Sequence, residues 1–140
     1  KIDILMKSLL KITWALILAG GAIISCNENE EYDTITSTDK AAIDSVKIES
    51  DTMSVFAIQS LKTYSTYTSK CTGFYGYDYV HAPNRSREVT AYQYHTNTEC
   101  STEKYVSHNQ INFSPQAAGT YTFKFWSSNN NWIIKTIVVE

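Results

Sequence analysis

The feature that most constrains the fold is a strict alternation of apolar and polar side chains near the end of the chain. Tyr121, Phe123 and Phe125 alternate with Thr120, Thr122 and Lys124. Because successive side chains of a β-strand point to opposite faces, this pattern predicts a strand with one face against a core and the other in water.

Residues 41–140 carry short apolar and β-branched runs separated by turn residues, with glycine only at positions 73, 76 and 119. Such composition favours strands over helices. We therefore predict an all-β domain over 41–140, with strands at 43–49, 52–58, 61–68, 73–80, 88–94, 104–113, 119–127 and 132–139. A helical turn between Ser54 and Thr63 stays open as an alternative, because the apolar residues there also fit a mixed period.

The polar stretch 127–131 predicts a terminal hairpin with a long polar tip. Alternation along its second strand places Trp132, Ile134, Thr136 and Val138 on one face, and Ile133, Lys135, Ile137 and Val139 on the other. We predict that the first set faces the core, because that arrangement keeps Lys135 in water.

The segment Gly119-Thr120-Tyr121-Thr122-Phe123 resembles the start of strand F in an immunoglobulin-like sandwich. The resemblance implies an antiparallel sandwich of seven to eight strands, in which the hydroxyl of Tyr121 ties back to the chain at a corner. Ala117 stands at the family's aspartate position and Phe123 at its cysteine position. The usual inter-sheet disulfide of the family is therefore not expected.

Near the beginning of the sequence, Lys7 and Lys11 precede an uncharged apolar run over 12–24. A membrane-spanning helix needs about 20 residues, so this run is too short to span. Small residues crowd its end, and Cys26 follows directly. The pattern resembles the bacterial lipoprotein signal, which implies a signal-peptide helix, removal of residues 1–25 including a short upstream extension, and a lipid on Cys26. A plain signal peptide followed by a chance cysteine is the alternative.

Residues 26–40 are hydrophilic and begin with an acidic run, so we predict a flexible tether there. Acidic residues just after the lipidated cysteine resemble the surface-export signal of lipoproteins from Bacteroides and its relatives. That resemblance implies an outer-membrane protein on the cell surface, with the periplasmic face as the alternative. A solvated linker would have the same composition.

If Cys26 carries lipid, Cys71 and Cys100 remain as a pair in an exported chain, and we predict that they form a disulfide. Closing a loop of this length would stabilise the domain by roughly 3 to 4 kcal/mol on the chain-entropy model. Two free buried thiols would be expected only if the domain stayed in the cytoplasm.

Tyrosine is over-represented and alternates along two neighbouring predicted strands. Tyr75, Tyr77 and Tyr79 lie on the first strand, and Tyr92 and Tyr94 on the second. If the strands fold back around 82–87, Tyr75 would pair with Tyr94 and Tyr77 with Tyr92. These rings form either a flat binding surface for a sugar or a protein, or simply part of the core, and the second reading is the commoner role of tyrosine in sheets.

Two further places are candidates for binding. Trp126 and Trp132 flank the predicted polar tip, although at least one of them is expected in the core. His81, Asn84, Arg85 and Arg87 form a polar turn that would suit an anionic group, but solvated turns commonly have the same residues.

Little in the sequence indicates catalysis or a metal. His81, His95 and His108 lack ligand spacing, and the sequence contains neither G-x-S-x-G nor a glycine-rich phosphate loop. Four acidic residues remain as a weak basis for a small hydrolase: Asp78, Glu88, Glu99 and Glu103. The net charge of −2 and the lack of a basic cluster also argue against a nucleic-acid partner.

The sequence thus predicts a lipid-anchored envelope or cell-surface protein that is not an enzyme and has no cofactor. Its expected role is a binding or adhesion module for a glycan or a surface protein. The alternative is a structural accessory subunit of an envelope complex without a small-molecule ligand.

Overall fold

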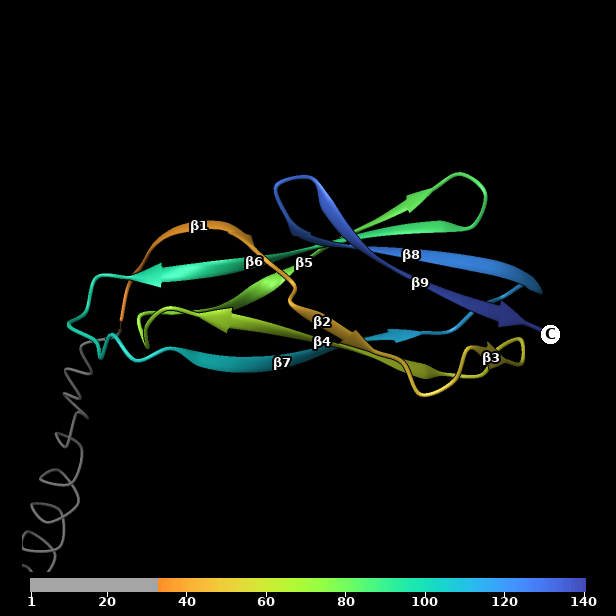
Figure 1. The fold of residues 1–140 in the computed structure, drawn as a ribbon, viewed down its shortest axis with the longest axis horizontal. Helices are drawn as coiled ribbons and strands as arrows, with labels where there is room; N and C mark the ends of the chain where they lie inside the picture. The colour runs from red at the N-terminus through yellow and green to blue at the C-terminus, as the bar shows by residue number, and fades with distance from the viewer. Residues whose placement is uncertain (1–32) are drawn as a thin grey trace, which may run out of the picture. The chain divides into compact units, whose positions relative to one another are not determined.

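The computed structural model describes residues 33–140, and these form nine β-strands without a helix. The predicted all-β fold is therefore confirmed for this part of the chain (Figure 1). The strands are β1 (Ile35–Ala41), β2 (Ser45–Lys47), β3 (Thr52–Met53), β4 (Gln59–Tyr67), β5 (Thr72–Ala82), β6 (Ser86–Thr96), β7 (Tyr105–Phe113), β8 (Gly119–Ser128) and β9 (Asn131–Val139).

The strands form two sheets that pack face to face. Strand β6 organises the larger, six-stranded sheet, because β5 pairs along its whole length while β1 and β8 pair with different halves of it. Beyond β8 the sheet continues through β9 to β3. The smaller sheet has the order β2-β4-β7 and lies below the larger one in Figure 1.

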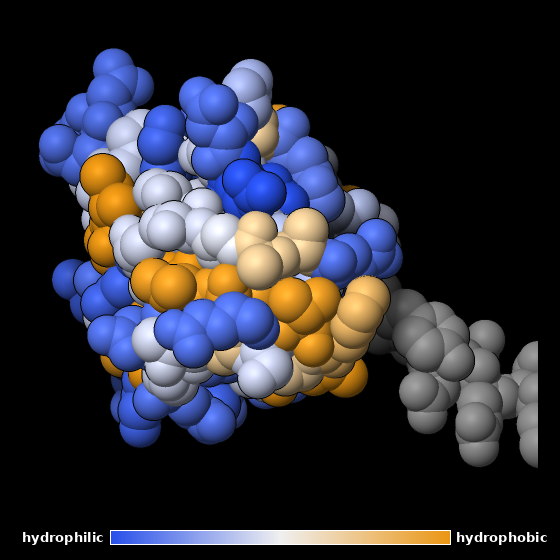
Figure 2. All heavy atoms as spheres, turned by 90° about the vertical axis from the view of Figure 1, so that its right-hand side faces the viewer, coloured by the Kyte–Doolittle hydropathy of each residue, from blue (hydrophilic) through white to orange (hydrophobic). Residues whose placement is uncertain are grey.

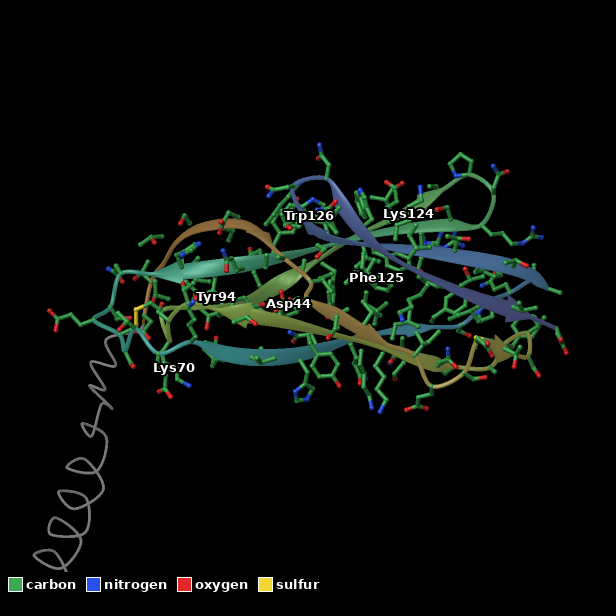
Figure 3. The ribbon with its side chains drawn as sticks, viewed as in Figure 1. Asp44, Lys70, Tyr94, Lys124, Phe125 and Trp126 are labelled. Carbon is green, nitrogen blue, oxygen red and sulfur yellow. A yellow bond between two sulfur atoms is a disulfide. The ribbon has the colours of Figure 1, made fainter. Side chains whose placement is uncertain are left out.

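Buried side chains from both sheets make up the core. Tyr121, Phe123 and Phe125 of β8 are buried, as their alternation predicted. They meet Phe113 of β7, whose ring lies edge-on to Phe123 with 4.9 Å between the ring centroids. In Figure 3, Phe125 lies between the sheets, whereas the next residue, Trp126, lies on the outer side.

Two strand pairs are parallel, which corrects the prediction of an antiparallel sandwich with seven to eight strands. Strand β6 pairs with β8 in parallel over Ser86–Val89, and β3 pairs with β9 in parallel. The first pair is parallel because β7, the strand between them in sequence, crosses to the other sheet and back. Hydropathy patterns do not record such a crossover.

The predicted tether over 26–40 is wrong over its last residues, because β1 begins at Ile35 and pairs with β6. Almost all side chains of β1 are exposed, so it is held in the sheet by backbone hydrogen bonds and by side-chain contacts with β6, among them Asp39 with His95 and Gln93. Conversely, the strands predicted at 43–49 and 52–58 are longer than the observed strands β2 and β3, which cover only part of those ranges. The alternative helical turn is not formed, since its second half lies in β4.

The predicted inward face of the last strand is also wrong. Ile137 and Val139 are buried and Ile133 is half-buried, whereas Trp132, Ile134 and Val138 are exposed. A two-residue turn at Asn129 and Asn130, both with positive φ, replaces the predicted long tip and sets the register. In that register Lys135 lies opposite Phe123 on the inward face and is half-buried. A lysine can occupy such a position because its aliphatic stem packs on apolar neighbours while its ammonium group reaches water.

The predicted Cys71–Cys100 disulfide is present, with the two Cα atoms 5.5 Å apart. It joins the residue before β5 to the connection that leads into β7. The signal peptide, its cleavage and Cys26 lie outside the described residues. Among residues 33–140 there is no helix with the length and apolar character required to cross a bilayer.

The turn between β5 and β6 packs onto the first residues of β8. The carbonyl oxygen of Arg85 accepts a hydrogen bond from the N–H of Thr122 at 3.2 Å. The side chain of Arg85 lies against Gly119, where an added Cβ would stand 2.9 Å from Nε of Arg85. Gly119 also has a φ of +134°, which other residues rarely adopt.

We predict that Gly119→Ala lowers the free energy of unfolding by about 1 to 3 kcal/mol, since it combines backbone strain with displacement of Arg85. Gly76→Ala is the matched control, because no atom lies within 4 Å of an added Cβ there and its φ is not positive. Urea unfolding of both variants checks this. Equal effects at the two positions would contradict the packing of Arg85 against Gly119.

Candidate functional site: a cleft between the two sheets

The predicted pairing of the tyrosines is wrong, by one position at Tyr92 and by two at Tyr94. Tyr92 lies opposite Gly76, and Tyr94 lies opposite Gly73, because a bulge between Phe74 and Gly76 adds a residue to β5. The bulge leaves Tyr75 60% exposed, while Tyr77 packs on the core and its hydroxyl lies 2.6 Å from the Thr63 hydroxyl oxygen. The five tyrosines therefore do not form one flat surface.

Three of the predicted tyrosines nevertheless gather around a shallow hollow of about 350 Å³. Tyr75, Tyr77 and Tyr92 line it together with Thr38, Gly76 and Asp78. Tyr94 is not among these residues, and its ring lies over Gly73, where an added Cβ would be 2.7 Å from the Tyr94 hydroxyl. Tyr79 lines a different and larger cavity.

Near the disulfide, two tyrosines pack in the interior of the sandwich. Tyr67 is 1% exposed, and its ring lies 5.4 Å from that of Tyr105. Tyr105 donates its hydroxyl to the carbonyl oxygen of Thr72 at 2.6 Å. Burial, together with the neighbouring phenols of Tyr105 and Tyr77, raises the pKa of Tyr67 to about 12.

The two tryptophans lie opposite each other on β8 and β9, on the outer face of the larger sheet. Trp126 is half-buried and Trp132 is exposed, and the ammonium of Lys40 lies 5.5 Å from the centre of the Trp126 ring. Neither tryptophan belongs to the buried core, contrary to the expectation that at least one does. They form part of an exposed sheet face and do not line either cavity.

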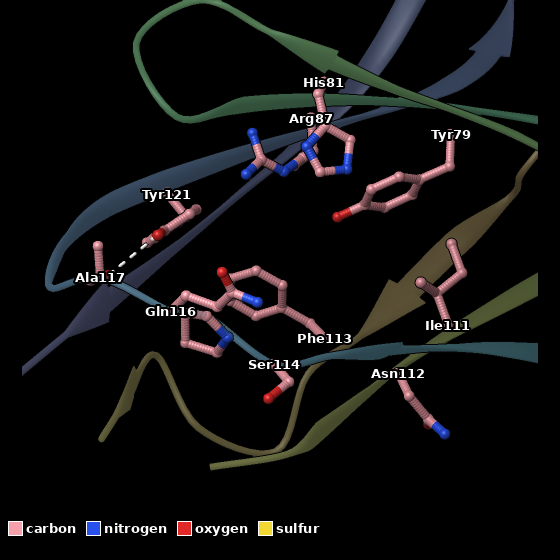
Figure 4. Close-up of a pocket in the computed structure, with 11 residues that line it drawn as sticks. Tyr79, His81, Arg87, Ile111, Asn112, Phe113, Ser114, Gln116, Ala117 and Tyr121 are labelled. Carbon is pink, nitrogen blue, oxygen red and sulfur yellow. Dashed lines mark hydrogen bonds between the residues drawn. The ribbon is translucent and has the colours of Figure 1, made fainter. Parts of the chain in front are cut away.

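The larger cavity, about 510 Å³, is a cleft between the two sheets at the end opposite the disulfide. Figure 4 shows its two walls. The upper wall comes from the β5–β6 hairpin and β8, and the lower wall from the end of β7 and the connection after it. The lining residues are Tyr79, His81, Arg87, Ile111, Asn112, Phe113, Ser114, Pro115, Gln116, Ala117 and Tyr121.

Tyr121 holds the walls of this cleft together. Its hydroxyl donates a hydrogen bond to the carbonyl oxygen of Ala117 at 3.0 Å, which is the tie expected of a tyrosine at this corner. Its ring packs against Phe113 at 5.1 Å, and the guanidinium of Arg87 lies 5.4 Å from its centre. One side chain thus connects the β5–β6 hairpin, β7 and the β7–β8 connection.

The cleft combines aromatic rings with positive charge. Arg87 interacts with the phenol of Tyr79, whose pKa is raised by burial and held down in part by that guanidinium. The Tyr79 ring also meets the ring of His81 edge-on at 5.3 Å. None of the eleven lining residues is acidic, so the paired carboxylates of a glycosidase are not available within the cleft.

Only part of this site could be predicted from the sequence. Tyr79, Tyr121, His81 and Arg87 were each singled out, but for different reasons and at different places. The residues from β7 and its connection were missed, because their pattern indicates an ordinary strand and turn. Their position opposite Arg87 depends on β7 lying in the other sheet, which no local signal in the sequence indicates.

No group of three or more metal-ligating side chains occurs within the part of the chain that the structure describes. Comparison of the chain with protein-family models, with curated proteins and with solved structures finds no match.

We predict that folding stability decreases as the pH rises from about 10 to about 12. The ordinary pKa of a tyrosine phenol is 10.0, so in this range an unfolded chain loses the Tyr67 proton while the folded domain keeps it. Tyr67→Phe should reduce this alkaline loss, measured by urea unfolding across the pH range. Tyr75→Phe, at an exposed ring, is the control, and identical profiles for both variants would contradict the assignment.

Proposed function

We propose that this chain is a lipid-anchored envelope or cell-surface protein that acts as a non-catalytic binding module, with a glycan as its ligand. The observation that carries the proposal is the cleft between the sheets, with its aromatic interior and polar margins. Its volume falls within the usual range of ligand pockets, about 300 to 1,000 Å³.

The composition of the cleft suits a sugar. Tyr79 is half-buried and supplies aromatic surface on which the C–H face of a sugar ring can pack, whereas the rings of Phe113 and Tyr121, each 5% exposed, belong to the core beneath it. Gln116 is exposed on the opposite wall and offers an amide group to sugar hydroxyls, whereas the side chains of Asn112 and Ser114 point away from the cleft (Figure 4) and bond to Ser60 and to the carbonyl oxygen of Phe56. A few placed polar groups around an apolar interior are the usual arrangement of a small-ligand site.

The position of the cleft supports presentation away from a membrane. Strand β1 begins beside Thr96, close to the disulfide, whereas the cleft lies where β5 ends and β7 ends (Figure 1). The ten-residue distance along β5 corresponds to roughly 30 Å at the rise of a strand. If Cys26 carries lipid, the anchor precedes one end of the sandwich and the cleft opens at the other.

The proposed fold family remains an immunoglobulin-like sandwich. The hydrogen bond from Tyr121 to Ala117 supports it, because this tie is the feature that suggested the family. The two parallel strand pairs depart from the simple form of that sandwich. Location on the cell surface is proposed together with the lipid anchor, and the periplasmic face remains the alternative.

A second candidate function, an accessory subunit that contacts other proteins, is favoured by exposed apolar side chains. The end of the domain shown in Figure 2 carries an apolar area, and Phe56 and Ile58, in the connection that packs on Pro115, are 71% and 73% exposed. Phe56 has a φ of 64°, which is rare for a bulky residue. Ile134 adds exposed apolar surface on the outer face of β9.

Filling the cleft should abolish ligand binding without unfolding the domain. The test is a screen of the purified full chain against a glycan array and against envelope proteins, repeated with Gln116→Trp. Gln116 is exposed at the margin of the cleft, so a bulky ring there is expected to block access while sparing the core. Gln110→Trp is the matched control, on the same wall but outside the cleft.

We expect glycan binding that Gln116→Trp reduces at least tenfold and Gln110→Trp leaves unchanged. Protein binding that is insensitive to Gln116→Trp would favour the accessory subunit instead. No glycan bound by the unmodified chain would contradict the proposed binding module.

A further inference from the structure

We infer that the glycan bound in this cleft is acidic, with a carboxylate or sulfate group that pairs with Arg87. The inference rests on the proposed function, since it names the ligand class of the same cleft. It goes further because the aromatic and amide residues alone would serve a neutral sugar equally well.

The charge of the cleft is opposite in sign to that of the whole chain. The chain as a whole has a formal net charge of −2, yet the cleft is lined by Arg87 and His81 and by no acidic residue. Arg85, the only other arginine, lies beside it, 6.0 Å from the centre of the Tyr121 ring. Both arginines of the sequence are therefore placed at the cleft of an acidic protein.

Arg87 forms no ion pair with another residue of 33–140. The ion pairs among residues 33–140 are Lys62 with Glu49, His95 with Asp39 and Lys124 with Glu88. Arg87 instead donates to the carbonyl oxygen of Ser86 at 2.9 Å and lies over Tyr121. A partly buried guanidinium held by neutral groups gains most from an anionic ligand.

The guanidinium of Arg87 is held in place by its neighbours. The Ser86 carbonyl and the Tyr121 ring hold its position, and a guanidinium has five N–H donors in a planar fork. Carboxylate and sulfate oxygens match that fork, and a group that is already ordered loses little side-chain entropy on binding. The hollow around Tyr75 lacks this arrangement and includes Asp78.

The test compares acidic oligosaccharides with neutral forms of the same sugars. The probes are oligogalacturonate and its methyl ester, sialyllactose and lactose, and heparin fragments before and after removal of sulfate and reduction of the carboxylates. Titration calorimetry with the purified full chain should show at least one acidic probe binding tenfold or more tightly than its neutral partner. Binding of the acidic probe should weaken as salt is raised.

Three variants assign the effect to Arg87. Arg87→Gln should reduce the ratio of the affinity for the acidic probe to the affinity for its neutral partner at least tenfold. Arg87→Lys keeps the charge and loses the planar fork, so its affinity for the acidic probe should lie between that of the unmodified chain and that of Arg87→Gln. Retained binding by this variant also shows that substitution at position 87 does not unfold the domain. Lys47→Gln removes an equal charge from exposed β2 and should have no effect.

Equal affinity for acidic and neutral partners would overturn this inference and leave the proposed glycan-binding function standing. A preference for acidic probes that survives Arg87→Gln would also overturn it. Failure of every probe in the array and in the titrations would instead remove the proposed function itself.

Discussion

The arrangement of this domain at its functional end depends on the packing of one side chain, Tyr121. Its hydroxyl fixes the β7–β8 connection through Ala117, one part of its ring meets Phe113 of the smaller sheet, and Arg87 of the β5–β6 hairpin lies over it. A hydrogen bond of this kind contributes about 1 kcal/mol, and an aromatic pair contributes about as much beyond the area it buries. Because these contacts share one ring, they place the walls of the cleft relative to each other.

The two ends of the sandwich are stabilised by different chemistry. At one end the Cys71–Cys100 disulfide and the buried pair Tyr67 and Tyr105 close the interior. At the other end a cleft of about 510 Å³ lies between the sheets, and the buried rings of Phe113 and Tyr121 pack beneath it, with Arg87 over Tyr121. The parallel pairing of β6 with β8 makes this possible, since it places the β5–β6 turn beside the start of β8.

Local patterns in the sequence predicted those features that depend on local physics. The alternation around Phe123 located a buried strand face, the two remaining cysteines located a disulfide, and Tyr121 was expected to tie back to the chain. Features that depend on register were predicted wrongly. The bulge before Gly76 shifted the tyrosine pairs, and the two-residue turn after Ser128 turned Lys135 toward Phe123. The cleft could not be predicted because its walls come from strands that only the crossover of β7 brings together.

We propose that the ligand binds between the sheets, beside Arg87 and Tyr121. The most direct measurement is a site-resolved NMR titration of the isotope-labelled full chain with the acidic probe that binds best. We expect the largest backbone shifts at the end of the β5–β6 hairpin and in residues 112–117, with the disulfide end unchanged. Shifts centred on Tyr75 and Tyr92, or on Trp132 and Ile134, would place the ligand elsewhere and contradict the account.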